Sequence, residues 1–267
     1  MMESNNGIVC SSIGNRLGNQ MCCIACGISF AKKYNKKFVF CSKENVLYNS
    51  TSYTEYKWIV DRFERLPLSE INGFNAIYED NAQNFINFDE YANEDKIILY
   101  GVFQNDKYYD RNLIQEIFGN SKEDNERIYK KYGDLSNYVS MSVRRGDYLN
   151  LQSIFIVPKK EWYERAYRKY FEGSDILVSG DDLKWCKENL NFENVNVHFL
   201  EEEDPVETLK IKQCCKKHII PPSTYSWWSA YLSGENSTVV APNLWYTRNS
   251  GLISENKYPD GWLKEEL

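Results

Sequence analysis

Short apolar runs alternate with amphipathic runs between residues 137 and 241, and this alternation constrains the fold more than any other feature of the chain. The apolar runs at 138–143, 175–179, 195–200, 217–220 and 238–241 have the length of β-strands. Helical patterns lie between them at 158–170, 181–190, 205–215 and 223–232. Strands that alternate with helices form parallel sheets covered by helices. The second half of the chain therefore predicts a doubly wound, parallel α/β domain.

The first 41 residues predict a smaller unit of the same kind. An apolar strand at 7–11 is followed by a glycine-containing turn at 13–18, a helix at 19–34 and a second strand at 37–41. Residues 42–95 are polar and predict irregular structure without a recognisable motif. A strand at 97–102 and a helix at 106–118 follow, and a further helical segment lies within 119–133.

Composition excludes several classes of function. The net charge is −6, whereas strong nucleic-acid binding usually needs a basic face, so we expect no nucleic-acid partner. No apolar run is long enough to cross a membrane, and residues 1–7 do not resemble a secretory signal, so we expect a soluble, cytoplasmic protein. The single C-x-x-C pair, Cys23 and Cys26, lies inside a predicted helix without a second pair. We interpret the cysteines as reduced, buried thiols and not as a zinc or redox site.

Two adjacent arginines follow a predicted strand in the segment Ser-Val-Arg-Arg-Gly-Asp-Tyr at 142–148. Open α/β sheets bind ligands at the carboxyl ends of their strands. Arginine binds phosphate through paired hydrogen bonds and stays charged. Of Arg144 and Arg145, one can pair with Asp147 while the other faces a ligand. The alternative is an ordinary surface ion pair.

Several hydroxyls gather where the strand at 217–220 gives way to a helix. Ser223, Thr224 and Ser226 surround Tyr225 at the start of that helix. A helix N-terminus with exposed amides and hydroxyls binds anions. One of these hydroxyls can instead act only as the helix cap. Three hydroxyls in four positions favour an anion site.

Asp181 and Asp182 follow the strand at 175–179. Because adjacent residues at a helix start do not face one ligand, a metal site is disfavoured. We expect one carboxylate to cap the helix and the other to contact a ribose or to hold the local structure.

The turn before the first helix is rich in glycine and asparagine. It does not have the spacing of a dinucleotide fingerprint, and the chain holds no P-loop. Its glycines still allow the backbone to approach a ligand closely, although an ordinary strand-to-helix turn is the alternative. The candidate binding residues of this turn are Gly14, Asn15, Arg16, Gly18 and Asn19.

Together these segments resemble the α-1,2-fucosyltransferases of glycosyltransferase family eleven. The turn at 15–21 looks like G-[GR]-L-G-N-Q-M with Asn15 for the first glycine, and 143–148 matches V-R-R-G-D-Y. Segments at 101–109, 180–187, 223–228 and 240–245 look like the family's G-x-x-Q-x-x-K-Y-F, S-D-D-x-x-W-C-K, S-[ST]-F-S-W-W and A-P-x-x-W patterns. Gly180 stands in place of the serine of the second pattern, and Tyr225 in place of the phenylalanine of the third. They occur in the family's order over most of the chain.

The resemblance implies a GT-B-like α/β fold, in which two Rossmann-type domains face each other across a cleft. Residues 1–134 would form the acceptor-side domain, and residues 135–267 the GDP-fucose-binding domain with a C-terminal tail. It also implies inverting transfer of L-fucose from GDP-fucose to a hydroxyl of an acceptor glycan, such as O2 of galactose, without a cofactor or a metal. Another sugar-nucleotide transferase on this fold, or a catalytically inactive carbohydrate-binding relative, stays open as an alternative.

The resemblance assigns roles to individual residues. Arg145, supported by Arg144, would stabilise the charge on the leaving GDP, and Asp147 would orient the arginines. The family has a histidine near the guanine where this chain has Ser142, so Ser142 stays in the expected base site and a carboxylate, assigned to Glu207, would hold the base. The expected donor-binding residues are Gly14, Asn15, Arg16, Gly18, Asn19, Ser142, Arg145, Asp181, Asp182, Glu207, Ser223, Thr224, Tyr225 and Ser226.

Overall fold

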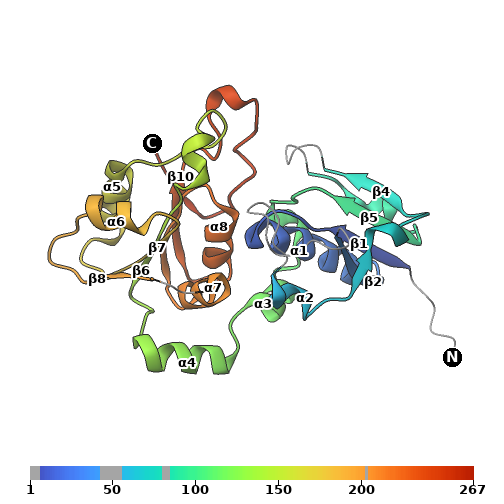
Figure 1. Cartoon of the computed structure of the whole chain (residues 1–267), viewed down its shortest axis with the longest axis horizontal. Coiled ribbons are helices and arrows are strands. Elements are labelled where there is room, and N and C mark those ends of the chain that lie inside the picture. Colours follow the sequence, from blue (N-terminus) through green and yellow to red (C-terminus); the bar gives the residue numbers. More distant parts are fainter. Residues whose placement is uncertain (1–6, 43–55, 80–84, 202–203) are drawn as a thin grey trace. The chain divides into compact units, whose positions relative to one another are not determined.

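The structure is a computed structural model that describes residues 7–42, 56–79, 85–201 and 204–267 (Figure 1). The chain divides into two compact units, Met1–Ile114 and Gln115–Leu267. This division lies 20 residues before the boundary at 134 that the family resemblance implied. The reason is the helix α4 (Lys122–Tyr132), whose Ile128 packs against Leu177 and Ile211 in the core of the second unit.

The first unit is built on a parallel five-stranded sheet with the order β3-β2-β1-β5-β4. Its strands are β1 (Ile8–Ser12), β2 (Lys37–Ser42), β3 (Arg65–Pro67), β4 (Asn75–Tyr78) and β5 (Lys96–Tyr100). The predicted β-turn-α-β unit is present as β1, α1 (Leu17–Lys33) and β2, and most of α1 is buried. A short helix, α2 (Lys57–Val60), precedes β3.

The polar segment 42–95 is not entirely irregular, as the sequence had suggested, because β3 and β4 lie within it and pair with β2 and β5. Residues 43–55 and 80–84 of that segment lie outside the described residues. The predicted helix at 106–118 is divided as well. A 3-10 turn at Asp106–Tyr108 precedes α3 (Arg111–Phe118), since Tyr109 between them is extended.

The second unit is built on a parallel six-stranded sheet with the order β11-β10-β9-β6-β7-β8. Its strands are β6 (Val139–Val143), β7 (Ile176–Gly180), β8 (Val197–Phe199), β9 (Lys217–Ile219), β10 (Thr238–Pro242) and β11 (Leu263–Glu265). After β6 the chain builds outward to β7 and β8, and it then returns to add β9, β10 and β11 on the other side. The strand order therefore reverses between β6 and β9, and such a switch point is where doubly wound sheets bind ligands.

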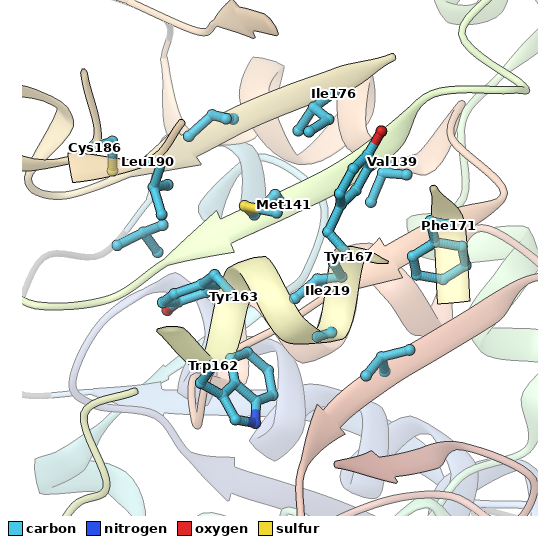
Figure 2. Packing of buried hydrophobic residues seen from close by; sticks show 14 residues of the cluster. Val139, Met141, Trp162, Tyr163, Tyr167, Phe171, Ile176, Cys186, Leu190 and Ile219 are labelled. Carbon is cyan, nitrogen blue, oxygen red and sulfur yellow. The ribbon is translucent and has the colours of Figure 1, made fainter. Parts of the chain in front are cut away.

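Helices cover both faces of this sheet. On one face α5 (Lys160–Phe171) packs Trp162, Tyr163 and Tyr167 against Val139 and Met141 of β6, as Figure 2 shows. Burying a large apolar side chain contributes roughly 1.5–3 kcal/mol. A second core, on the other face, contains residues of α4 and α7 (Pro205–Gln213) and Leu177 of β7. The neighbours of Leu177 along β7, Ile176 and Val178, belong to the core under α5, and successive side chains of a strand point to opposite faces. The remaining helices are α6 (Leu183–Asn189) and α8 (Thr224–Tyr231).

The edge strand β11 is the element of this sheet that the sequence analysis did not predict. It pairs with β10, and Glu265 at its end is buried. The Glu265 carboxylate accepts hydrogen bonds from Arg165, Lys169 and Tyr170, which come from α5. These contacts join the C-terminal segment to the body of the unit.

Within the described residues, no helix combines the length and the apolar character that crossing a membrane requires.

Candidate functional site

Three loops of the second unit leave neighbouring strands at the same edge of the sheet. The arginine turn (residues 144–147) follows β6, and the aspartate pair (Asp181 and Asp182) follows β7. The hydroxyl-rich segment (residues 223–226) follows β9. Since β6 pairs with both β7 and β9 in parallel, the carboxyl ends of the three strands lie together at the switch point. The structure thus gathers three of the four segments that the sequence analysis selected.

Arg144 is held on both sides by carboxylates. Its Nη1 donates to Asp181 Oδ2 at 2.6 Å and its Nη2 to Asp147 Oδ1 at 2.5 Å. The guanidinium also lies 4.8 Å from the centre of the Tyr148 ring. Because its terminal nitrogens are both engaged, Arg144 fixes the shape of the turn.

Arg145 is anchored through its backbone and keeps most of its side-chain donors. Its amide donates to Asp181 Oδ1 at 2.8 Å, and its Nε donates to Asp182 Oδ2 over 3.3 Å. The guanidinium stacks on the Trp185 ring at 4.0 Å. Within the part of the chain that the structure describes, its two terminal nitrogens make no hydrogen bond. A planar cation with free, oriented donors suits a phosphate group.

The turn can form only because Gly146 lacks a side chain. A Cβ at this position would lie 2.5 Å from Asp181 Oδ2, the oxygen that binds Arg144. Gly180 has a similar role at the end of β7, where a Cβ would lie 2.6 Å from the carbonyl oxygen of Val143. Both glycines bring the loops after β6 and β7 into close contact.

The two aspartates have separate roles, as the sequence analysis expected for an adjacent pair. Asp182 caps α6, because its Oδ1 accepts a hydrogen bond from the amide of Trp185 at 3.1 Å. Asp181 holds the arginine turn instead. Among the described residues, no group of three or more His, Cys, Asp or Glu side chains is arranged to hold a metal ion.

The hydroxyl-rich segment begins α8. Ser223 caps this helix, with its Oγ accepting from the amide of Ser226 at 3.5 Å. Ser223 and Ser226 are buried, whereas Thr224 and Tyr225 are partly exposed. The Tyr225 hydroxyl donates to the carbonyl oxygen of Pro205 in the first turn of α7, at 2.5 Å. The segment therefore includes the cap that the sequence analysis allowed for and is tied to a second helix.

Ser142 lies at the end of β6 beside Ser179 of β7, and only 2% of it is exposed. Its Oγ has no hydrogen-bond partner among the described residues. An unpaired buried hydroxyl can be satisfied by a bridging water.

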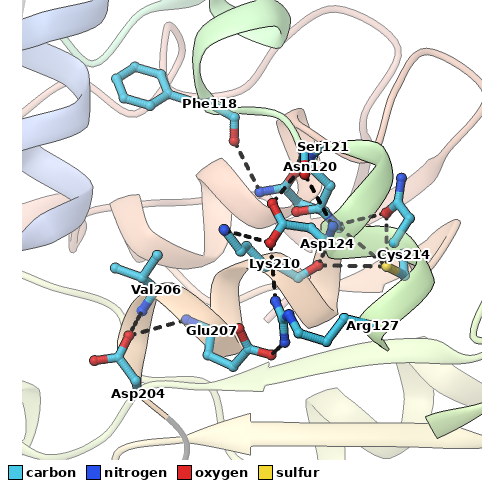
Figure 3. A network of polar contacts seen from close by, with 12 residues as sticks. Phe118, Asn120, Ser121, Asp124, Arg127, Asp204, Val206, Glu207, Lys210 and Cys214 are labelled. Carbon is cyan, nitrogen blue, oxygen red and sulfur yellow. Dashed lines mark hydrogen bonds and ion pairs between the residues drawn. The ribbon is translucent and has the colours of Figure 1, made fainter. Parts of the chain in front are cut away.

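Glu207, the carboxylate expected to hold the base, lies in the first turn of α7 and forms an ion pair with Arg127 of α4. Figure 3 shows this pair beside a second ion pair, in which Lys210 Nζ lies 2.7 Å from Asp124 Oδ1. Asp204 caps the same helix through the amides of Val206 and Glu207. The contact between Glu207 and a base stays a prediction.

The fourth segment, the turn from Gly14 to Asn19, belongs to the first unit and joins β1 to α1. Asn15 adopts a left-handed conformation with φ 63°, and its carbonyl oxygen accepts from Gln20 Nε2 at 2.9 Å. Arg16 is the N-terminal cap position of α1 but makes no side-chain cap hydrogen bond, and Gly18 and Asn19 already lie in the first turn of this helix. Backbone strain at a polar turn is common at ligand sites.

Sequence reasoning overlooked two aromatic partners of the arginines. Tyr148 lies in the V-R-R-G-D-Y motif and Trp185 follows the aspartate pair in the W-C-K motif. An aromatic residue close to charged residues in both motifs was the available signal. It also overlooked Lys212 on α7, for which the sequence holds no signal, since a lysine in a helix usually faces solvent.

Solved structures share the fold of this chain. A structure of POFUT1 in complex with GDP-fucose has a TM-score of 0.55 at 12% identity, covering 89% of this chain and 98% of that one. A structure of NodZ alpha-1,6-fucosyltransferase soaked with GDP-fucose has a TM-score of 0.52 at 12% identity, covering 92% and 97%. The two parallel sheets with their helices and these matches confirm the predicted α/β, GT-B-like fold class.

Curated relatives match along the sequence. An O-antigen biosynthesis glycosyltransferase, WbnK, from Escherichia coli is 28% identical over 90% of this chain and 95% of its own length. An alpha-1,2-colitosyltransferase from Escherichia coli is 28% identical over 62% of this chain and 61% of that protein. A galactoside alpha-(1,2)-fucosyltransferase 2 from Bos taurus is 29% identical over 40% of this chain and 33% of that protein. The last two similarities thus span only part of each relative.

The sequence model described as glycosyl transferase family 11 matches residues 2–266, which is almost the whole chain. The motifs that carry the resemblance and the arginine turn at the switch point agree with this match. The chain therefore belongs to glycosyl transferase family 11 and is a glycosyltransferase.

Proposed function

We propose that this enzyme transfers L-fucose from GDP-fucose to a hydroxyl of an acceptor glycan, O2 of galactose or a similar sugar, with inversion and without a metal. The observation that carries the proposal is Arg145, whose terminal nitrogens are free of hydrogen bonds to the described residues at the switch point of the sheet. A structural relative was solved with GDP-fucose, and the bovine relative is named as a galactoside alpha-(1,2)-fucosyltransferase.

The proposed step is a direct displacement at C1 of fucose. The acceptor oxygen forms a bond to C1 while the bond from C1 to the phosphate oxygen breaks, and the proton of the acceptor hydroxyl passes to solvent water. Negative charge grows on the β-phosphate of the leaving GDP. Arg145 and the hydroxyls of Ser223, Thr224 and Ser226 would stabilise this charge, while Arg144, Asp147 and Asp181 hold the turn in place.

Metal independence gives the first prediction. GDP should bind with micromolar affinity in the presence of EDTA, because arginine and the N-terminus of α8 supply the positive charge. Titration calorimetry with and without added Mg²⁺ or Mn²⁺ measures this directly. Binding that disappears on chelation would overturn the metal-free mechanism.

GDP-colitose is a second candidate donor, favoured by the similarity to an alpha-1,2-colitosyltransferase. Colitose is fucose without the 3-hydroxyl, so the two donors present the same nucleotide and differ at one sugar position. Turnover measured with GDP-fucose, GDP-colitose and a UDP-sugar distinguishes the two donors from each other and from a different nucleotide. If the protein neither hydrolyses any of these donors nor transfers their sugar, the catalytically inactive, carbohydrate-binding alternative is favoured instead.

Base recognition gives the second prediction. A carboxylate can accept hydrogen bonds from guanine N1–H and the N2 amine together, which adenine cannot offer. GDP should therefore bind roughly tenfold or more tightly than ADP, since leaving buried partners unpaired costs about 1–3 kcal/mol. Glu207→Gln should weaken GDP binding and narrow that gap, although Arg127 must share the carboxylate with the base.

Two further variants sharpen this test. Arg127→Met removes the ion pair but leaves the Glu207 carboxylate, so it should keep the preference for GDP over ADP. Ser142→His should be tolerated or should improve donor affinity, because it restores the family residue. A preference for GDP that is unchanged in Glu207→Gln would assign base recognition to another group.

A further inference from the structure

Lys212 is a lysine buried completely inside the second unit. It lies near the end of α7, and none of its surface is exposed. Its Nζ has no hydrogen-bond partner within the described residues. Burial lowers the pKa of Lys212 to about 7, because removing the ammonium from water disfavours the charged form. An amine that can lose its proton near neutrality is thus enclosed in the protein.

The groups around Lys212 do not supply a counter-charge. Cys215 follows α7, and burial raises the pKa of its thiol, so this group stays neutral. His218 of β9 is neutral too, since burial and the neighbouring Lys212 lower its pKa to about 3. Lys216, another cation, bonds to the carbonyl oxygen of Ser233. No carboxylate of a described residue forms an ion pair with Lys212.

The structure connects Lys212 to the hydroxyl-rich segment through one aromatic ring. The Nζ of Lys212 lies 5.0 Å from the centre of the Tyr225 ring, close enough for a cation–π interaction. Tyr225 lies between Ser223 and Ser226, and its hydroxyl bonds to Pro205 in the first turn of α7. The ring is thus held between the buried amine and the start of α8.

We propose that protonation of Lys212 is coupled to binding at the donor site. The ammonium form of Lys212 is stabilised when a nucleoside diphosphate binds at the start of α8. Binding then transfers a proton from the solvent to Nζ of Lys212. The inference rests on the proposed function, because it requires the diphosphate to bind beside Ser223 and Ser226.

The physical reason is reciprocal coupling between two sites. A bound diphosphate brings negative charge next to a low-dielectric region in which the ammonium has no partner, so it raises the affinity of Lys212 for a proton. By the same coupling, the protonated lysine strengthens diphosphate binding. Donor and GDP affinity should fall as the pH rises above about 7, where the free enzyme loses this proton.

Calorimetric titration with GDP between pH 6 and 9 tests the proposal, with two buffers of different ionisation enthalpy at pH 7.5. The parent enzyme should take up a fraction of a proton on binding, and its affinity should fall about fivefold across this range beyond the change due to GDP itself. Lys212→Met should take up no proton beyond that of GDP and should show the pH dependence of GDP alone. The difference between enzyme variants cancels the ionisation of the GDP phosphate.

Lys210→Met is the matched control, because Lys210 lies on the same helix and is paired with Asp124 at 2.7 Å. It should keep the proton uptake of the parent enzyme. Lys212→Gln provides a second test if methionine perturbs folding, which thermal unfolding reports. Equal proton uptake in the parent and the Lys212 variants, or its loss in Lys210→Met as well, would overturn the proposal. A parent enzyme that binds no GDP at any pH would instead overturn the proposed function, and this inference with it.

Discussion

Replacing Arg145 by alanine should lower turnover by roughly a hundredfold or more, which is the usual loss when one preorganised donor to a developing negative charge is removed. The loss should appear in kcat, since the charge on the β-phosphate grows as the bond to C1 breaks. Folding should survive, because the terminal nitrogens of Arg145 bond to no described residue. Steady-state kinetics with GDP-fucose and thermal unfolding measure the two effects separately.

Arg144→Ala distinguishes the two arginines. Its side chain joins Asp147 and Asp181, so its removal should destabilise the turn and lower both activity and thermal stability. Arg168→Ala is the control, because that exposed residue of α5 pairs only weakly with Glu164 at 3.8 Å. Near-normal turnover in Arg145→Ala with a large loss in Arg144→Ala would reverse the two roles. If both Arg144→Ala and Arg145→Ala keep normal turnover, the catalytic site lies elsewhere in the protein.

Elements with a clear apolar pattern were predictable from the sequence. The strands that became β1, β2, β6 and β9 and the helices that became α1, α5, α7 and α8 match their predicted positions to within about two residues at most ends. Each buries an apolar face against one sheet, and that burial is what the sequence pattern records. The site loops were predictable for the same reason, because the ends of buried parallel strands fix where the turns lie.

Of the described edge strands, β8 was predicted, but three others were not. The strands β3, β4 and β11 have three or four residues and form by pairing with a neighbouring strand that the local sequence does not reveal. Pairings between distant charges were hidden too. The ion pair between Arg127 and Glu207 joins residues 80 positions apart, and it depends on how α4 packs against α7. The burial of Lys212 depends on how α7 packs against neighbouring elements such as α8, which carries Tyr225, because an isolated helix would expose it.

Asp181→Ala should lower kcat/KM by about a hundredfold, although this carboxylate is not expected to contact the reacting atoms. It accepts from Arg144 Nη1 at 2.6 Å and from the Arg145 amide at 2.8 Å, so it fixes both arginines relative to β7. Without it, Arg144 keeps Asp147 and the Tyr148 ring. The backbone amide of Arg145 loses its acceptor. A displacement of about 1 Å at a catalytic group can cost a hundredfold in rate.

The variants of Asp181 should form a graded series. Asp181→Asn keeps an oxygen for the Arg145 amide but removes the charge that holds Arg144, so its activity should lie between those of the parent and the alanine variant. Asp175→Ala is the matched control, because Asp175 precedes the same strand at its opposite end and bonds to Asn196. It should leave kcat/KM unchanged even if stability falls. Equal losses in Asp175→Ala and Asp181→Ala, in proportion to their thermal destabilisation, would reduce Asp181 to a structural residue and contradict its role in positioning the arginines.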